Sequence, residues 1–258
     1  MIKKRLVASV IVKNDQVVQS FNYKKFLPVG KIKPVIANLE RWAVDEIIVS
    51  VIDRTLNSLG PNYKILNEIK ELSINTPLTY SGGIRNLNDA VQLIKNGADR
   101  VCVESLVTRN YDELKKISYS LGRQSLIVSI PLFIKNNTVH FYDYLNKTSK
   151  KIPTNFLNIF KNHICSEVIV KDINAHNNQD VKNFFDYRII KKINFHNNIL
   201  ILDGGVDSHL TINKMLSYKN VSAAVIGNSL YHKELSYQFF KKLAKSVYLR
   251  KETYNENI

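Results

Sequence analysis

Short apolar segments alternate with amphipathic segments along the chain, and this alternation restricts the possible folds more than any other feature. Eight segments are rich in β-branched residues and have the length of strands: 5–12, 46–52, 77–80, 100–105, 125–130, 167–173, 199–203 and 223–227. Helix-like segments lie at 33–44, 62–73, 86–98, 110–122, 154–163, 179–193, 208–217 and 233–247. This pattern over 258 residues predicts an α/β fold, a (β/α)8 TIM barrel, with an open doubly wound sheet as the alternative.

An internal repeat favours the barrel over the open sheet. The phrase "DEIIVSVID" at 45–53 resembles "SEVIVKDIN" at 166–174, and "TYSGGI" at 79–84 resembles "LDGGV" at 202–206. A third pair, 98–106 and 222–230, follows in the same order. We therefore predict one domain over residues 1–258, built from two half-barrel repeats, with a loop hairpin at 133–151.

Glycine pairs follow a predicted strand in each half, at Gly82–Gly83 and at Gly204–Gly205. Ligands of parallel α/β folds bind at this end of the strands. Glycine lets backbone N–H groups approach a phosphate next to a helix N-terminus. The pairs thus indicate two phosphate loops and a ligand with a phosphate at each end, although tight turns use glycine for purely structural reasons as well.

Composition narrows the class of protein. The net charge is +15 and the pI is about 9.6, which is compatible with nucleic acid, anionic membranes or anionic substrates. The basic residues are scattered and form no aromatic-and-basic motif, so we expect no nucleic-acid partner. Charge-driven binding to nucleic acid or a membrane surface remains an alternative, and it would weaken steeply with salt.

Several other classes of site find no support in the sequence. No apolar run is long enough to span a membrane, and two cysteines, Cys102 and Cys165, form no disulfide framework, so we expect a cytoplasmic protein. Cys102 is interpreted as a small buried residue. The six histidines show no metal-binding spacing, and no P-loop or GxGxxG motif occurs. We therefore expect neither a metal nor a cofactor.

Several phrases resemble the cyclase subunit family of imidazole glycerol phosphate synthase. They include "KRLVASVIVKNDQVVQSFNY", "PLTYSGGIRNLNDAVQLIKNGADRV", "GRQSLIVSI" and "ILDGGV", and the resemblance extends over nearly the whole chain. It implies a half-barrel duplication that binds a two-phosphate substrate. It also implies a glutaminase partner, whose ammonia passes through the barrel to an active site at the carboxyl ends of the strands.

The resemblance places two catalytic aspartates where this chain has Ile11 and Pro131. Neither side chain transfers a proton, so we predict no catalytic residue of the family type. A third family acid falls on Val51, and Asp53 is expected two residues further on the same strand face. Asp15 is expected in a turn. The alternative is a diverged cyclase of histidine biosynthesis with substitute groups.

The phosphate loops implied by the resemblance are altered too. The family's Asn-Thr becomes Glu104–Ser105, a glycine-containing stretch becomes "NAHNNQD", and Asp203 precedes the second glycine pair. A carboxylate at Glu104 would repel a phosphate unless it were protonated or paired. The residual phosphate-loop residues are Gly82, Gly83, Ser105, Gly204, Gly205, Gly227, Asn228 and Ser229.

The resemblance also implies a charged ring at the other end of the barrel. The family's ammonia entrance maps onto Arg5, Glu46, Arg100 and Glu167, with Arg100 in place of a Lys. These four residues are predicted to form an ion-paired ammonia gate, and Asp99 is predicted to lie at the docking face for the glutaminase. Arginine keeps the charge of lysine but is bulkier.

The phrases "FLPVGKIKPV" and "WAVDEIIVSVID" look most similar to the second, cyclase-like subunits of surface-polysaccharide loci. That branch implies a barrel that supplies ammonia to an N-acetyl-sugar amidotransferase in lipopolysaccharide or O-antigen biosynthesis. The sequence therefore favours a non-catalytic, ammonia-conducting subunit with a glutaminase and a sugar amidotransferase as partners.

Overall fold

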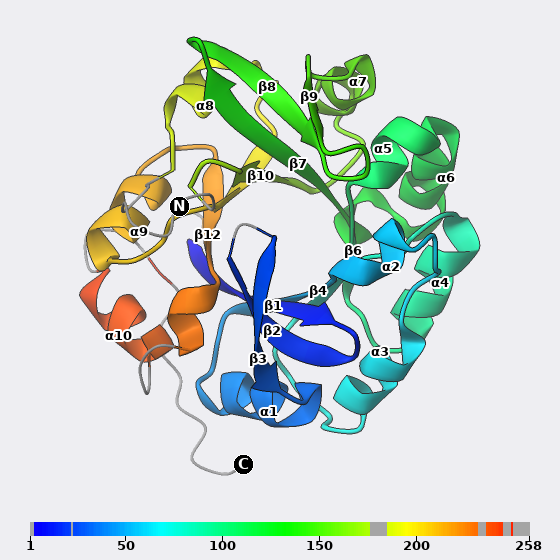
Figure 1. The fold of residues 1–258 in the computed structure, drawn as a ribbon, viewed down its shortest axis with the longest axis vertical. Helices are drawn as coiled ribbons and strands as arrows, with labels where there is room; N and C mark the ends of the chain where they lie inside the picture. Colours follow the sequence, from blue (N-terminus) through cyan, green and yellow to red (C-terminus); the bar gives the residue numbers. More distant parts are fainter. Residues whose placement is uncertain (1–2, 22, 176–184, 232–235, 245–248, 250–258) are drawn as a thin grey trace.

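The computed structural model describes residues 3–21, 23–175, 185–231, 236–244 and 249. It shows a closed barrel of parallel strands with helices outside (Figure 1). Each barrel strand pairs with the next, and the last pairs with β1, so the predicted (β/α)8 barrel is confirmed. In spatial order the strands are β1 (Arg5–Lys13), β4 (Glu46–Val51), β5 (Leu78–Ser81), β6 (Arg100–Val103), β7 (Leu126–Lys135), β10 (Glu167–Asp172), β11 (Ile199–Asp203) and β12 (Val221–Ile226).

The helices form because their apolar residues recur with helical spacing and pack onto the barrel. Within the described ranges they are α1 (Ile32–Arg41), α2 (Ile52–Leu56), α3 (Tyr63–Lys70), α4 (Leu87–Lys95), α5 (Ser105–Arg109), α6 (Tyr111–Leu121), α7 (Thr154–Asn162), α8 (Arg188–Lys192), α9 (His209–Leu216) and α10 (Ser236–Leu243).

Asparagine side chains cap several of these helices. Asn86 accepts a hydrogen bond from Asp89 N at 2.9 Å, and Asn62 and Asn110 cap α3 and α6 in the same way. The predicted helices at 179–193 and 233–247 extend beyond the described residues, which contain only their α8 and α10 parts.

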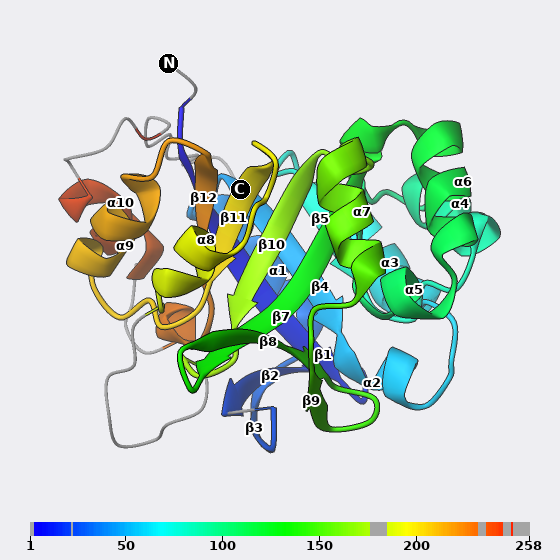
Figure 2. The ribbon, with the colours of Figure 1, turned by 90° about the horizontal axis from the view of Figure 1, so that it is seen from above.

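Both halves begin with a strand that continues into an antiparallel hairpin. After β1 come β2 (Gln16–Phe21) and β3 (Lys25–Gly30), and after β7 come β8 (Thr138–Asp143) and β9 (Thr148–Lys150). The turns Asn14–Asp15 and Asn136–Asn137 have positive φ at both residues, between 47° and 59°. Figure 2 shows both hairpins at one end of the barrel and the start of β1 at the other. The half-barrel repeat therefore includes its loops, and the hairpin predicted after strand five is confirmed.

The inside of the barrel is layered. An apolar cluster fills its middle and consists of Val7, Ile48, Cys102, Ile127, Ile169, Ile201, Ala223 and Val225. Because side chains on a strand alternate between two faces, residues two positions before or after these also point inward. Charged residues lie at the amino-terminal side of this layer, and polar residues lie at the carboxyl-terminal side.

Candidate functional site

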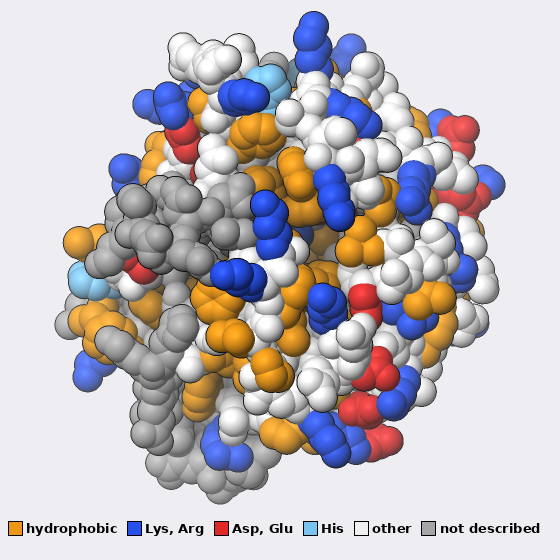
Figure 3. Space-filling model, in the orientation of Figure 1, with side chains coloured by type: hydrophobic (Ala, Val, Ile, Leu, Met, Phe, Trp, Pro, Cys, Tyr) orange, Lys and Arg blue, Asp and Glu red, His pale blue; other side chains and the backbone are white. Residues whose placement is uncertain are grey.

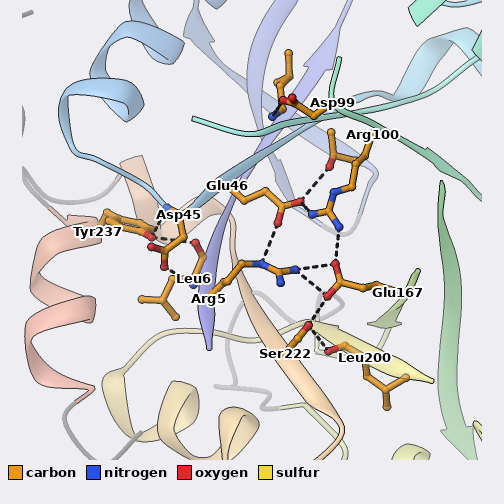
Figure 4. A network of polar contacts seen from close by, with 12 residues as sticks. Arg5, Leu6, Asp45, Glu46, Asp99, Arg100, Glu167, Leu200, Ser222 and Tyr237 are labelled. Atoms are coloured by element: carbon orange, nitrogen blue, oxygen red, sulfur yellow. Dashed lines mark hydrogen bonds and ion pairs between the residues drawn. The ribbon is translucent and has the colours of Figure 1, made fainter. Parts of the chain in front are cut away.

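The four predicted gate residues lie together at the amino end of the barrel (Figure 4). Arg5 donates from Nε to Glu46 Oε2 at 3.1 Å and from Nη2 to both carboxylate oxygens of Glu167 at 2.8 Å. Arg100 donates from Nη1 to Glu167 Oε2 at 2.5 Å and from Nη2 to Glu46 Oε1. Each arginine thus bridges both glutamates, and the four side chains form a closed ring.

Hydroxyl groups complete the pairing of the two glutamates. Thr79 donates to Glu46 at 3.0 Å, and Ser222 donates to Glu167. Burial alone would raise the pKa of Glu167, but the charges of Arg5 and Arg100 and the Ser222 hydrogen bond outweigh it, so the pKa is lowered. Glu46 is 1% exposed and Glu167 is 5% exposed. The ring is therefore a buried, ion-paired plug across the start of the strands.

A second buried network lies beside the ring and was not predicted. Lys241 donates to Asp45 Oδ1 at 2.7 Å, and Asp45 Oδ2 accepts from Leu6 N at 2.9 Å. The hydroxyl of Tyr237 donates to Leu6 O and accepts from Asp45 N, at 2.9 and 2.8 Å. These contacts attach α10 to β1 at Leu6, the residue after Arg5. Lys241 and Tyr237 lie far from Asp45 in the sequence, so no local pattern indicates the network.

Asp99, the predicted docking residue, is exposed at the same end of the barrel. Its Oδ2 accepts from Leu78 N at 2.7 Å, where β5 begins. The carboxylate therefore caps a strand, and its other face is open to solvent. A role in docking stays a prediction.

The carboxyl end of the barrel contains a cavity of about 930 Å³. Figure 3 looks onto this end, where lysine and arginine side chains lie around a hollow with a largely hydrophobic wall. The predicted first phosphate loop lines the cavity with Gly82, Gly83 and Ser105. Four lysines also line it: Lys13, Lys24, Lys147 and Lys171.

Lys171 is the innermost of these charges and was not singled out by sequence. It lies on β10, its side chain is 17% exposed, and its Nζ is 3.5 Å from Glu104 Oε2. Burial alone would lower the pKa of Lys171. Electrostatic interactions with Tyr23, Glu104 and Asp203 outweigh this effect and raise the pKa, so the side chain is a cation. Ser129 donates to Glu104 at 3.1 Å. The Glu104 carboxylate is thus paired with a cation and a hydroxyl group. Because its charge is balanced, it no longer repels an anion.

The first glycine pair is required by close packing of the backbone. A Cβ on Gly82 would lie 2.2 Å from Val51 O, and one on Gly83 would lie 2.7 Å from Gly60 C. Gly83 N donates to the Thr55 hydroxyl at 3.0 Å, so this N–H is already used within the protein. The structural explanation of this pair is therefore sufficient, and phosphate binding by Gly82, Gly83 and Ser105 stays a prediction.

The second loop lines a separate cavity of about 190 Å³, with Gly204, Gly205, Gly227, Asn228 and Ser229 in its wall. Asn228 accepts from Ser20 N at 3.1 Å and donates to Ser20 O at 2.7 Å. Ser229 donates to Val206 O at 2.7 Å. The side chains of Asn228 and Ser229 thus hold β2 and the loop after β11, while Asp203 lines the same cavity.

The positions of the family acids hold apolar residues in this structure as well. Ile11 lines the smaller cavity, and Pro131 is buried on β7 beside Lys171. The expectation that Asp53 extends a strand is wrong, because β4 ends at Val51 and Asp53 lies in α2. Asp15 lies in a turn as predicted, where its Oδ1 accepts from Asn62 Nδ2 at 2.7 Å.

Other candidate chemistry is limited within the described residues. Cys102 and Cys165 are free and buried, and burial raises the pKa of each thiol to about 12, so neither is a thiolate nucleophile at neutral pH. The described residues include no group of three or more His, Cys, Asp or Glu side chains that could hold a metal ion. None of the described helices is both long and apolar enough to cross a membrane.

Comparison with known proteins places this geometry in a family. Residues 5–236 match the family described as "Histidine biosynthesis protein". The chain belongs to the histidine biosynthesis protein family. Because the family match begins at Arg5 and ends at Ser236, it includes the charged ring and both cavities.

Individual members of the histidine biosynthesis protein family resemble the chain over different lengths. A putative imidazole glycerol phosphate synthase subunit hisF2 of Vibrio vulnificus is 36% identical over 145 residues, which are 56% of this chain and 53% of that protein. A putative subunit hisF2 of Campylobacter jejuni is 29% identical over 58% of this chain and 60% of its own length. The imidazole glycerol phosphate synthase subunit HisF of Dictyoglomus thermophilum is 28% identical over 90% of this chain and 91% of its own length. The chain thus spans only about half of the Vibrio protein that it matches.

Proposed function

We propose that this barrel pairs with a glutaminase and conducts ammonia to a sugar amidotransferase in the biosynthesis of a surface polysaccharide, and that its own cyclase chemistry is lost. Two relatives whose names contain hisF2 support the comparison with a second type of cyclase-like subunit. The glutaminase, the amidotransferase and the cytoplasmic location are parts of this proposal.

The observation that carries the proposal is the ring of Arg5, Glu46, Arg100 and Glu167. All four side chains converge at the start of the strands, and the next layer inward is apolar. An ammonium ion would lose its hydrating water in that apolar layer and gain no polar partner in exchange. Neutral ammonia is small and loses little hydration free energy there. The ring is closed, so a partner that supplies ammonia must separate at least one arginine from a glutamate.

The carboxyl end supports loss of the cyclase reaction. General acid–base catalysis needs a titratable group within hydrogen-bond reach of the reacting atoms. Ile11 and Pro131 supply none, and Pro131 lacks even a backbone donor. The amino end thus retains its charged residues, while the reactive end lacks the family's proton-transfer groups.

The direct experiment is to mix the protein with its cognate glutaminase and measure ammonia release from glutamine. We expect the barrel to bind the glutaminase and stimulate it. Arg100→Lys should keep at least half of this effect, because it restores the family's residue, whereas Arg100→Met should uncouple glutamine hydrolysis from ammonia transfer. Arg188→Met is a control, since Arg188 is exposed and pairs with the neighbouring Asp186. Failure of the barrel to bind or stimulate the glutaminase contradicts the proposal.

A diverged cyclase of histidine biosynthesis is the second candidate. The match to the Dictyoglomus HisF protein over 90% of the chain favours it, as does the cavity with Lys171 and Glu104 in its wall. This candidate requires turnover of the phosphoribosyl substrate with saturating ammonia, and loss of turnover in Lys171→Met and Glu104→Gln. No turnover by the wild-type protein removes it.

A further inference from the structure

The two hairpins at the carboxyl end of the barrel are rich in lysine. The segments 13–31 and 133–151, which contain the hairpins after β1 and β7, each carry four lysines and one aspartate. We call these two segments together the hairpin face. Of its eight lysines seven are exposed, and Lys13 is half-buried. Each half of the barrel thus contributes a hairpin in which positive charge exceeds negative charge by three.

The tips of the two hairpins contact each other. Tyr23 lies in the turn between β2 and β3, Tyr144 lies in the turn between β8 and β9, and their rings meet edge to face with 5.3 Å between the centroids. An exposed lysine in each turn, Lys24 and Lys147, lines the larger cavity. Neither lysine forms an ion pair with another described residue. Because the tips touch, the hairpin face is one continuous basic surface, and Figure 3 shows its Lys and Arg side chains around the hollow.

Apolar side chains are exposed on the same surface. On β3, Leu27 is 53% exposed and Val29 is 37% exposed. Aromatic side chains of the hairpins are more buried, since Phe26 and Tyr142 are half-buried in the wall of the larger cavity. Protein interfaces combine an apolar centre with a polar rim, and exposed apolar residues that are rimmed by polar ones mark such surfaces. The hairpin face has both components.

We propose that the hairpin face is the docking surface for a second protein whose matching surface is acidic. The lysines that the described residues leave unbalanced attract carboxylates and speed the encounter of the two proteins. Leu27 and Val29 supply the apolar part of the contact. Since Lys24 and Lys147 line the larger cavity, a partner that binds both of them covers the mouth of this cavity.

A protein fits this surface better than nucleic acid or a small anion. Single-stranded nucleic acid stacks its bases on aromatic rings, whereas Leu27 and Val29, the large apolar side chains that the hairpin face exposes, are aliphatic. A small anion needs donors that converge on one point, but the lysines are spread along the edges and tips of two hairpins. An extended acidic surface matches this spread.

The identity of the partner rests on the proposed function. Ammonia that crosses the apolar layer would emerge in the larger cavity, so the protein on the hairpin face would be the sugar amidotransferase. Under the same proposal the glutaminase binds at the opposite end of the barrel, where the charged ring lies. The two partners would therefore not compete. The charge and the position of the hairpin face do not depend on the proposed function.

The test is calorimetric titration of this protein with its cognate sugar amidotransferase, at low salt and at physiological salt. We expect a complex that weakens as salt is added, because charge attraction is screened. The double variant Lys24→Glu with Lys147→Glu changes one lysine in each hairpin and should weaken binding at least roughly ten-fold, since like charges then face each other. Leu27→Ser should weaken binding roughly three- to ten-fold through loss of apolar contact. Both variants should stimulate the glutaminase as the wild-type protein does.

Matched controls separate the position of a charge from its effect on net charge. Lys161→Glu with Lys219→Glu makes the same change in net charge at exposed lysines outside the hairpin face, at the end of α7 and before β12. Leu157→Ser matches Leu27→Ser, because Leu157 is 42% exposed on α7. Both controls should bind the amidotransferase with wild-type affinity. Urea unfolding of every variant checks that it is folded.

Three results overturn the proposal: absence of amidotransferase binding, equal binding by the hairpin variants and their controls, or a single-stranded oligonucleotide that binds more tightly than the amidotransferase and depends on the same lysines. Binding at the hairpin face without glutaminase stimulation would contradict the proposed function and support this surface. Glutaminase stimulation, together with an amidotransferase that binds the hairpin variants normally, would support the proposed function and overturn this surface.

Discussion

The two ends of the barrel differ in how completely their polar groups are paired. At the amino end, Arg5 and Arg100 each contact both glutamates of the ring, and each glutamate also accepts from a hydroxyl. At the carboxyl end, Asp53 Oδ1 and the Tyr144 hydroxyl lack partners beside an open cavity. Fully paired buried groups stabilise one closed arrangement, whereas a buried polar atom without a partner costs free energy.

The difference also separates buried groups that gain partners on folding from buried groups that do not. Charges at the amino end are compensated within the chain, so removal of one leaves its partners buried and unpaired. Asp53 Oδ1 and the Tyr144 hydroxyl contribute nothing favourable to folding, because they have no partner to lose. Removal of a paired polar group should therefore be costly, whereas removal of one of these unpaired groups should not. Four experiments compare the two ends of the barrel.

The largest effect is expected from Glu167→Ala. This change leaves Arg5 and Arg100 with Glu46 as their remaining acidic partner in the ring, in a site where Glu167 is 5% exposed. Breaking a buried ion pair from one side costs about 3–5 kcal/mol of unfolding free energy, and urea unfolding measures it. Glu71→Ala is the control, because the Lys33–Glu71 pair is exposed and should contribute little. A small loss for Glu167→Ala would mean that water already reaches the ring.

Gly82→Ala tests the structural role of the first glycine pair. Its φ is +116°, and a Cβ would lie 2.2 Å from Val51 O, so the loop or the end of β4 must shift. We expect a loss of about 2–3 kcal/mol in unfolding free energy. Gly227→Ala is the matched control in the second loop, where a Cβ meets nothing within 4 Å and should cost nothing. Equal effects at both positions would show that the glycines were not retained for packing.

Asp143→Asn tests the hairpin that forms one wall of the cavity. Burial alone would raise the pKa of Asp143, but Lys150 and Asn146 bind the carboxylate and lower the pKa to about 2. Because the folded pKa lies below the ordinary 3.8, this stabilisation is present above pH 4 and is lost as the pH falls toward 2. We expect Asp143→Asn to cost about 1–2 kcal/mol at pH 7 and nothing near pH 2. Unfolding curves at both pH values measure the difference, and a cost independent of pH would contradict it.

The barrel and the ring could be predicted from sequence because both depend on short-range patterns. Buried strands are apolar and β-branched, and the first position of each strand fixes which side chains point inward. Once the strand containing Glu46 and its repeat containing Glu167 are aligned, both glutamates must lie at the same end. The hairpin β2–β3 was missed, although Asn14–Asp15 between two β-rich segments is a recognisable two-residue turn signal.

The cavity could not be predicted in the same way, because its residues come from loops and from distant strands. Lys171 points inward by the alternation of β10, but its pairing with Glu104 depends on how closely two strands of different halves approach inside the barrel. Tyr23 and Tyr144 belong to two separate hairpins, and only the folded chain brings them together. From sequence alone Glu104 is expected to repel a phosphate, because its partner Lys171 cannot be recognised there.

Identical substitutions of two tyrosines give the most discriminating comparison of the two ends. Tyr237 at the amino end donates to Leu6 O and accepts from Asp45 N, and it is fully buried. Tyr237→Phe leaves both backbone groups unpaired and should cost about 1–3 kcal/mol. Tyr144→Phe removes a buried hydroxyl that has no partner, so the unfolding free energy should stay the same or rise by up to about 1 kcal/mol. Urea unfolding of both variants decides the point. A comparable loss for Tyr144→Phe would mean that its hydroxyl stabilises the fold, and the two ends of the barrel would then not differ in the way described.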